Sequence, residues 1–472
     1  MNVPTLPCLV STLAPANLQI HLQISHLHST GLGVQRARNN RLNRFWTRAI
    51  LPAFFLWAAW ASRDRLALSS HSADRLRFVH SFTTASERAI IDDVVAEFTR
   101  RHPGLGIDQI VFNSETYQTI GWRLQFQGPR QSDIFFTWQG IKSRQAIENG
   151  WALDMAPYLS AGVTNSFVAS LLGRQGNQIF LLPQSVDLST LIWYNQERFG
   201  ELQITPPTTQ ADWLRVCQKL RQAGSLPLVQ GNREFWPMGN FGVELLGRSL
   251  GRNRLDSFFN GELPATPELL TPLGLFVEFA KGGYVDLPGV LDPGAIGNLS
   301  DLDAKVLFLS AKAVQHPIGS WFAADIRDAA ERNELKFTPD LFPIPAAPGE
   351  RLARGAVITG YQVNARTRHP QLAVEFLELL LSRPFQERFA ALGNLSARTD
   401  AVQFTTNPIP RKLLGLLSEP GEMIPPPDTG YSPERADLFY QLCSKLLLGQ
   451  LDLASAAVYW NDKQPRLRAK EQ

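Results

Sequence analysis

Cysteine is scarce in this chain, whose 472 residues include only Cys8, Cys217 and Cys443. No CxxC pair and no cysteine–histidine ligand spacing is present, so the sequence has no signature of a zinc finger or a disulfide framework. Cys217 lies in "ADWLRVCQKL", on the apolar side of a predicted helix, which predicts a buried thiol. We therefore expect no metal site.

The sequence also lacks the short motifs of common catalytic sites. It has no Gly-x-Ser-x-Gly, no His-Glu-x-x-His, no Gly-Lys-Ser/Thr phosphate loop and no Gly-x-Gly-x-x-Gly after a predicted strand. Carboxylates are plentiful, and the two acids of a glycosidase need only meet in space, so spacing alone does not exclude that class. We expect no catalytic residue and no cofactor, with an exported carbohydrate-active enzyme as the alternative.

Net charge is small, at +3 from 46 basic and 43 acidic residues. The first 61 residues contain five arginines and no acid, which leaves 41 basic and 43 acidic residues in the rest. Nucleic-acid binders carry a basic excess on one element, so this balance predicts no nucleic-acid partner. A neutral or uncharged polar ligand fits better.

The N-terminal part contains a basic stretch followed by thirteen apolar or small residues, 49–61. This run is too short to span a bilayer of about 30 Å comfortably, and "AWA" at its end has the small-x-small pattern of signal-peptidase sites. We interpret residues 1–61 as an N-terminal extension plus an export signal; an uncleaved membrane anchor and a buried helix are the alternatives. Residues 1–33 look unlike a signal, which an alternative start at Val34 would explain.

From residue 75 the pattern alternates between strands and helices. "RLRFVHSF", "GIDQIVFN" and "SDIFFTW" read as strands, separated by an amphipathic helix and a polar helix. This order predicts a doubly wound α/β unit, in which ligands bind outside the carboxyl ends of the strands. A satisfied, half-buried histidine is the alternative for His80. Candidate ligand contacts from this part are His80, Ser81, Phe82, Tyr117, Trp138 and Gln139.

The stretch "IFLLPQSVDLSTLIWYN" contains two apolar strands joined by residues 184–188. This link is either a hairpin or a crossing into a second lobe. Helices follow at "TQADWLRVCQKLRQAG" and "LLTPLGLFVEFAKGGYVD", and two more are divided at Pro384. We expect Trp236 in a polar, aromatic loop.

The strand "AKAVQHPIGSW" ends at Gly319 and Ser320 and then presents Trp321. Sugars have polar rims and apolar C–H faces, so the flat ring of Trp321 would provide a wall for a sugar, with core filling as the alternative. Trp236 is a second candidate wall, or else a loop anchor. Asp187 would accept hydrogen bonds from hydroxyl groups, or cap a turn.

The segment order resembles that of the extracellular solute-binding proteins, family 1, of ABC transporters, the sugar-binding group that includes maltose-binding protein. The matching pieces include "VVAEFTRRHPGLGI", "SDIFFTW", "ENGWALDMAPYL", "IFLLPQSVDLSTLIWYN", "VLFLSAKAVQHPIGSW" and "GNLSARTD", in order over about 390 residues. The resemblance implies an α/β, two-lobed periplasmic-binding-protein fold of type II, with ligand held between the lobes. Chain crossings are then expected at 184–188, "RGAVITG" and "NLSAR", with lobe 1 at 75–186 and 358–395 and lobe 2 at 187–357 and 396–472.

The resemblance further implies a monomer that binds a sugar, oligosaccharide or polyol in the periplasm or another extracytoplasmic space, free or anchored through residues 49–61. It would close around the ligand and dock on the transmembrane subunits of an ABC permease. A sensory sugar-binding subunit is another alternative. Arg354 stands where the family usually has glycine, which would suit an acidic group on the ligand. Candidate contacts from the later segments are Gln184, Asp187, Asn232, Trp236, Gly319, Ser320, Trp321, Arg354, Gly355, Tyr361 and Arg398.

Overall fold

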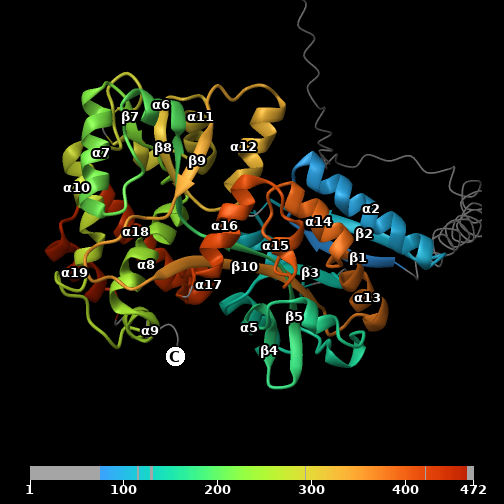
Figure 1. The fold of residues 1–472 in the computed structure, drawn as a ribbon. Helices are drawn as coiled ribbons and strands as arrows, with labels where there is room; N and C mark the ends of the chain where they lie inside the picture. Colours follow the sequence, from blue (N-terminus) through green and yellow to red (C-terminus); the bar gives the residue numbers. More distant parts are fainter. Residues whose placement is uncertain (1–74, 114–115, 128–130, 293, 420, 465–472) are drawn as a thin grey trace, which may run out of the picture. The chain divides into compact units, whose positions relative to one another are not determined.

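The computed structural model describes residues 75–113, 116–127, 131–292, 294–419 and 421–464. These residues form two mixed β-sheets flanked by helices (Figure 1). The export signal expected in residues 49–61 and the alternative start at Val34 lie outside the described residues. Within the described ranges, no helix has the length and apolar character needed to span a bilayer.

The first sheet has the strand order β2-β1-β3-β10-β5-β4, with β11 beside β10. β1 is parallel to β2 and β3, whereas β10 is antiparallel to β3 and β5. The three strands expected from the first alternating segment are confirmed. The seven strands of this sheet are β1 Arg75–His80, β2 Gly106–Val111, β3 Ile134–Trp138, β4 Gly173–Gln175, β5 Gln178–Leu188, β10 Ala353–Val363 and β11 Glu422–Ile424.

Helix α2, Ala85–Arg101, follows β1 and packs against α13 and α14. Its apolar face buries Ile90, Ile91, Val94 and Phe98, the helical spacing that the sequence predicts. The division at Pro384 is also confirmed, because α13 ends before it and α14 contains it in its first turn. The helices near this sheet are α2, α4 Trp122–Leu124, α5 Ile141–Glu148, α13 Pro370–Leu380, α14 Arg383–Ala391 and α15 Ala401–Phe404.

The second sheet has the order β7-β8-β6-β9 and belongs to a separate hydrophobic cluster, in which Trp193, Trp213 and Trp460 are fully buried. Its strands are β6 Leu191–Asn195, β7 Leu226–Leu228, β8 Ala313–Ile318 and β9 Pro339–Phe342. The remaining helices are α6 Gln196–Glu201, α7 Gln210–Gln222, α8 Trp236–Leu250, α9 Arg252–Phe259, α10 Gly274–Gly282, α11 Asp301–Leu309, α12 Phe322–Glu331, α16 Pro408–Ser418, α17 Pro427–Gly430, α18 Pro433–Leu447 and α19 Leu453–Asn461.

The sequence led us to expect residues 184–188 as a link between two strands. They are instead the second half of the eleven-residue strand β5. They remain extended because β10 pairs with them, from Thr359 opposite Ser185 to Ala356 opposite Leu188. β6 begins only three residues after β5 and lies in the other sheet, so the hairpin alternative is wrong.

The three segments expected to cross between lobes lie side by side. β5 pairs with β10, and the backbone N–H of Val186 donates to the carbonyl of Leu395 at 3.0 Å. The N–H of Ala397 donates to the carbonyl of Gln184 at 3.3 Å. These backbone hydrogen bonds hold β5, β10 and residues 395–397 together where β5 leaves the first sheet.

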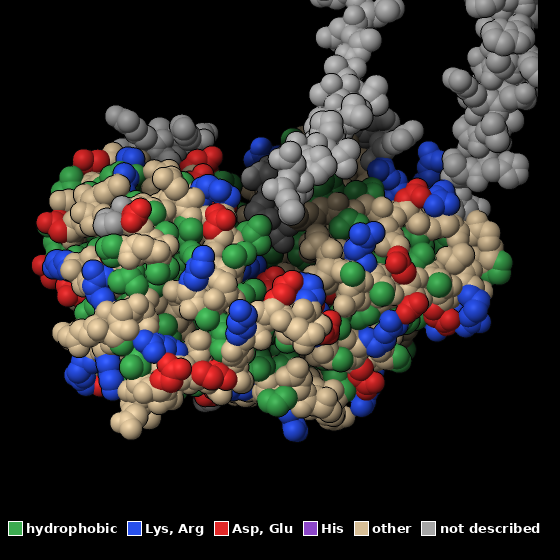
Figure 2. Space-filling view, turned by 90° about the horizontal axis from the view of Figure 1, so that it is seen from above, with side chains coloured by type: hydrophobic (Ala, Val, Ile, Leu, Met, Phe, Trp, Pro, Cys, Tyr) green, Lys and Arg blue, Asp and Glu red, His purple; other side chains and the backbone are tan. Residues whose placement is uncertain are grey.

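Cys217 is fully buried on α7, as predicted, and burial raises the pKa of its thiol to about 12. A thiol with such a pKa stays protonated at neutral pH and is a poor nucleophile. Figure 2 shows acidic and basic side chains interspersed over one face of the described part, with no single basic stripe on that face. This pattern agrees with the small net charge of the chain.

Candidate ligand-binding site

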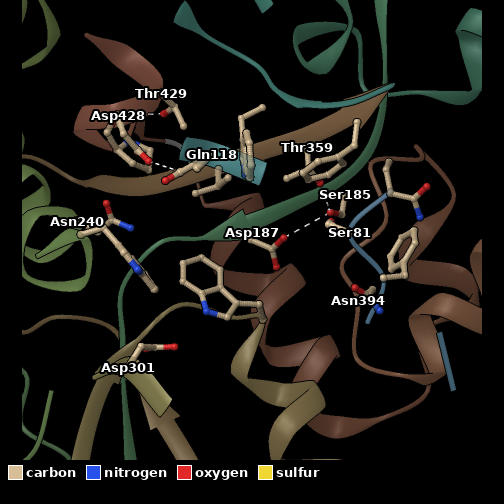
Figure 3. Close-up of a pocket in the computed structure, with 18 of the residues that line it drawn as sticks. Ser81, Gln118, Ser185, Asp187, Asn240, Asp301, Thr359, Asn394, Asp428 and Thr429 are labelled. Carbon is tan, nitrogen blue, oxygen red and sulfur yellow. Dashed lines mark hydrogen bonds between the residues drawn. The ribbon is translucent and has the colours of Figure 1, made fainter. Parts of the chain in front are cut away.

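A cavity of about 280 Å³ is lined by residues of β3, β5 and β10 in the first sheet and by residues of helices α8 and α11, which contact β8 of the second sheet. Its volume is close to the lower end of small-molecule pockets, about 300 Å³. Figure 3 shows Asp187 in the middle of the residues drawn, with side chains from several elements around it. The lining residues are Ser81, Phe82, Glu87, Gln118, Phe136, Trp138, Gln184, Ser185, Asp187, Trp236, Asn240, Asp301, Lys305, Trp321, Val357, Thr359, Asn394, Pro426, Asp428 and Thr429.

Two indole rings form one wall of the cavity. Trp321 lies between the end of β8 and the start of α12, and its ring centroid is 5.8 Å from that of Trp236. The strand ends before Gly319, as predicted, and a Cβ atom at Gly319 would overlap the ring of Trp321. Glycine is therefore needed here because the indole lies over its backbone.

We had expected Trp236 in a loop. It is instead the first residue of helix α8. Pro237 in the first turn of α8 favours the helical conformation and has no N–H to leave unpaired. The side chain of Trp236 nevertheless lines the cavity. The helix start, rather than a flexible loop, thus holds this ring.

Aromatic rings also line the cavity from the first sheet. Trp138 ends β3, and its ring packs edge-on against Phe136 with centroids 4.9 Å apart. Phe82 follows β1 and stacks on Phe389 at 4.7 Å. Both positions are at carboxyl ends of parallel strands, where the sequence predicts ligand contacts.

Asp187 is held by hydroxyl groups on both of its carboxylate oxygens. Ser320 donates to Oδ1 at 2.7 Å and Ser185 donates to Oδ2 at 3.4 Å. Ser185 is also hydrogen-bonded to Thr359 at 2.7 Å. Burial raises the pKa of Asp187 from 3.8 to about 6, opposed by the two serine hydrogen bonds and reinforced by the negative charge of Glu87. The carboxylate is thus fixed in orientation and only weakly compensated in charge.

Seven of the residues expected from the sequence line the cavity, and the others do not. The lining ones are Ser81, Phe82, Trp138, Gln184, Asp187, Trp236 and Trp321. Those outside the lining are His80, Tyr117, Gln139, Asn232, Gly319, Ser320, Arg354, Gly355, Tyr361 and Arg398.

Several of the residues outside are occupied within the interior. His80 is 1% exposed, and burial lowers the pKa of its imidazole to about 4. Tyr117 and Tyr361 are buried, and the hydroxyl of Tyr117 donates to the carbonyl of Phe136. Asn232 is fully buried and donates to Ser444 at 2.8 Å. These side chains are buried and do not line the cavity.

The two arginines pair with acids away from the cavity. Arg354 forms an ion pair with Glu419, and Arg398 donates to Asp400 at 2.8 Å. Arg354 therefore gives no support to an acidic ligand. A Cβ atom at Gly355 would overlap the hydroxyl of Ser189, which favours glycine at this position. The N–H of Gly355 donates to Glu244.

The sequence interpretation missed most of the polar lining residues. Glu87 had a local signal: Thr84-x-x-Glu87 is a capping-box pattern before an apolar run, and Thr84 does accept a hydrogen bond from the Glu87 N–H. Asn240 faces the cavity from within α8, and Asp428 from α17, with no local pattern to mark either. The missed lining residues are Glu87, Gln118, Phe136, Ser185, Asn240, Asp301, Lys305, Val357, Thr359, Asn394, Pro426, Asp428 and Thr429.

The chemistry of the cavity is that of a binding site. Indole and phenyl faces provide flat apolar surfaces, while carboxylates, amides and hydroxyls provide hydrogen bonds. In the part of the chain that the structure describes, no three His, Cys, Asp or Glu side chains are placed to hold a metal ion.

Comparison with known proteins relates this geometry to others. A model of the bacterial extracellular solute-binding protein family matches residues 83–387. An uncharacterized ABC transporter extracellular-binding protein from Pyrococcus horikoshii is 22% identical over 363 residues, which is 74% of this chain and 77% of the relative. The matched family range contains Trp138, Asp187, Trp236 and Trp321.

Two solved structures are similar in fold. A chitin oligosaccharide binding protein has a TM-score of 0.70 at 18% identity, over 84% of this chain and 100% of its own. The maltose/maltodextrin-binding domain from Bdellovibrio bacteriovorus, bound to maltotriose, has a TM-score of 0.63 at 16% identity, again over 84% and 100%. At these identities the likeness shows the fold alone, and it confirms the two-lobed α/β fold expected from the sequence.

Proposed function

The chain belongs to the bacterial extracellular solute-binding protein family, and we propose that it is the substrate-binding component of an ABC importer that binds a sugar or sugar derivative. Membership of this family of non-enzymatic receptors sets aside the carbohydrate-active enzyme kept as an alternative. The relative from Pyrococcus horikoshii, named as an ABC transporter component, supports the importer assignment.

A single observation carries the sugar assignment: one cavity combines aromatic side chains that pack with the two hydrophobic clusters and a carboxylate held by hydrogen bonds. Trp236 and Trp321 lie next to each other, Trp138 and Phe82 come from the ends of β3 and β1, and Asp187 is in the middle of the residues drawn in Figure 3. A sugar ring has apolar C–H faces and a rim of hydroxyls. Such a cavity matches both surfaces at once.

The energies are adequate for useful affinity. If a sugar covers on the order of 50 Å² of an indole face, each contact contributes about 1 kcal/mol at roughly 25 cal/mol per Å². Micromolar binding requires about 8 kcal/mol net. The two half-buried indoles, Trp236 and Trp321, supply about 2 kcal/mol of this, because Trp138 is only 8% exposed. Hydrogen bonds to the polar lining residues must supply most of the rest.

The transport step would follow from closure of two lobes around the ligand, lobe 1 at residues 75–186 and 358–395 and lobe 2 at 187–357 and 396–472. Contacts to both lobes exist only in the closed state, so the ligand favours that state. The closed form would then dock on permease subunits and deliver the ligand to them. Export through residues 49–61 remains part of this proposal.

Isothermal titration of the chain against a panel of mono- and disaccharides tests the proposal. We expect stoichiometric binding of at least one sugar without turnover, and at least tenfold weaker binding after Trp321→Ala, with unchanged thermal unfolding cooperativity. Trp151→Ala is the matched control, because Trp151 is a half-buried aromatic residue that does not line the cavity. Unchanged affinity in Trp321→Ala would refute the stacking role, and absence of any sugar binding would refute the function.

A further inference from the structure

Carboxylates dominate the charged groups that line the cavity. Glu87, Asp187, Asp301 and Asp428 face it, against Lys305 as the one basic lining residue among those described. Lys305 is already shared, with Asp301 at 3.1 Å and Asp325 at 3.2 Å. The cavity therefore carries an excess of negative charge.

Three of these carboxylates have neutral partners. Asp187 accepts from two serines, and Asp428 accepts from the side-chain amide of Gln118. Glu87 accepts from the hydroxyl of Thr84 at 2.8 Å and from the amide of Asn394 at 3.4 Å. Within the described residues, none of the three forms an ion pair with a Lys, Arg or His side chain. Lys142 attracts Asp428, and Arg327 attracts Glu87, from beyond ion-pair distance. Among the described residues, the only charged group that acts on Asp187 is another acid, Glu87.

Unused hydrogen-bond acceptors face the same space. Gln184 and Asn240 line the cavity, each is 4% exposed, and Gln184 Oε1 and Asn240 Oδ1 have no hydrogen-bond partner among the described residues. Asp301 Oδ1 is unpartnered in the same sense. A buried acceptor without a hydrogen-bond partner destabilises the folded protein. Binding of a ligand that brings a donor to it is therefore favoured. In Figure 3, Asn240 and Asp301 lie to one side of Asp187, and Ser81 and Asn394 to the other.

Charge compensation is the physical requirement. A carboxylate removed from water is costly unless a positive charge is near. Burial raises the pKa of Glu87 and Asp301 as well as that of Asp187, in keeping with incomplete compensation. The described acidic residues form no cluster of three or more that could hold a metal ion. The positive charge is therefore better placed on an extended ligand that reaches several separate carboxylates.

We propose that the ligand is a polyhydroxylated solute carrying a protonated amine, the chemical class of the amino sugars. The amine pairs with Asp187 and its neighbouring carboxylates, hydroxyls donate to Gln184, Asn240 and Asp301, and the ring lies against the indoles. This inference rests on the proposed function and narrows its substrate class.

Titration calorimetry at about pH 7 with matched saccharides tests it. The probes are glucosamine, N-acetylglucosamine, glucose and glucuronate, together with the β-1,4-linked disaccharides of the first three. Each of the other three monosaccharides has the pyranose ring of glucose and differs from glucose in one substituent. We expect the amine-bearing member of at least one series to bind at least tenfold more tightly than its acetylated and neutral counterparts, and glucuronate to bind least well.

Variants identify the source of the preference. Asp187→Asn, which keeps the size of the side chain and its acceptor oxygen, should reduce the preference for the amine to less than threefold. Glu148→Gln, an exposed carboxylate that does not line the cavity, should leave it unchanged. If Asp187→Asn does not fold by thermal melting, Asp428→Asn is the second variant, with the same direction expected.

The outcomes separate the two proposals. Equal or tighter binding of the neutral or acidic saccharides overturns the amine assignment and leaves the sugar-binding function standing. An amine preference that survives both Asp187→Asn and Asp428→Asn also overturns it. Failure of every saccharide to bind overturns the proposed function together with this inference.

Discussion

Under the proposed function, a single residue, Asp187, balances ligand binding against the stability of the ligand-free protein. Its carboxylate has two serine donors and no ion-pair partner within the described part of the chain. Such a group costs free energy while the cavity is empty and becomes useful when a ligand supplies donors or charge. Trp321 follows the same logic, since its ring is only half-buried and depends on Gly319 for its position.

We predict that Asp187→Asn makes the ligand-free protein more stable at pH 7.5. The folded-state pKa is about 6, above the ordinary value of 3.8, so the protonated acid favours the folded state. That contribution is complete below pH 4 and is lost as pH rises through about 6. At pH 7.5 the variant should gain on the order of 1–3 kcal/mol in free energy of unfolding, and the gain should disappear near pH 4.

Urea unfolding at the two pH values measures this difference. Glu148→Gln, at an exposed position, serves as the control and should show no comparable gain at either pH. A gain for Asp187→Asn that is the same at both pH values would contradict a titrating carboxylate as its cause.

At the scale of elements, helix α8 runs from the cavity to the start of strand β10. Trp236 and Asn240 face the cavity from its first turns, while Glu244 and Arg248 lie one and two turns further on. Glu244 accepts from the Gly355 N–H at 2.9 Å, and Arg248 donates to the carbonyl of Ala353 at 3.1 Å. Both bonds hold the start of β10.

We predict that Glu244→Ala lowers the free energy of unfolding by about 3–5 kcal/mol. Glu244 and Arg248 form an ion pair of 2.6 Å that is almost fully buried, so removal of the acid leaves a buried guanidinium without its ion-pair partner. Denaturant unfolding followed by circular dichroism provides the measurement.

The control for Glu244→Ala is Glu278→Ala on α10, which breaks an exposed pair with Lys281. Exposed pairs contribute about 0–1 kcal/mol, so this loss should be small. A loss for Glu244→Ala below about 1 kcal/mol would show that the pair does not anchor β10.

At the scale of the whole described unit, one cavity receives residues from two separate hydrophobic clusters. Phe136 and Trp138 belong to the first, and Trp236 and Trp321 pack against the second. A ligand that touches all four rings joins the clusters. Under the proposed function, its differential affinity for the closed arrangement sets how far closure proceeds.

We predict that a saturating sugar reduces the radius of gyration of the protein measured by small-angle X-ray scattering. The reason is that contacts on both sides of the cavity are made together only when the lobes approach. Trp321→Ala at the same sugar concentration should show a smaller change, because its weaker binding leaves more protein open. Identical scattering with and without bound sugar would contradict closure.

Local patterns were sufficient to predict much of the fold and part of the site. The spacing of Ile90, Ile91, Val94 and Phe98 predicts α2, and Gly319 marks the end of β8. These features depend on helical or strand periodicity and on backbone conformation, which neighbouring residues determine. Aromatic residues at strand ends, Trp138 among them, are likewise visible in the sequence, because the carboxyl ends of parallel strands share one edge.

Only the tertiary structure decided which side chains face the cavity. Arg354 pairs with Glu419, 65 positions away, and does not line the cavity. Asn240 and Asp428 line the cavity from helices that are far apart in the sequence. Residues 184–188 are a strand because β10, some 170 residues later, pairs with them. Periodicity determines which face of an element is apolar, but the partner of a polar side chain depends on which distant segments pack beside it. The sequence by itself therefore determined the family and the elements with clear periodicity, and the packing of distant segments determined the strand at residues 184–188 and the charge, donors and acceptors of the site.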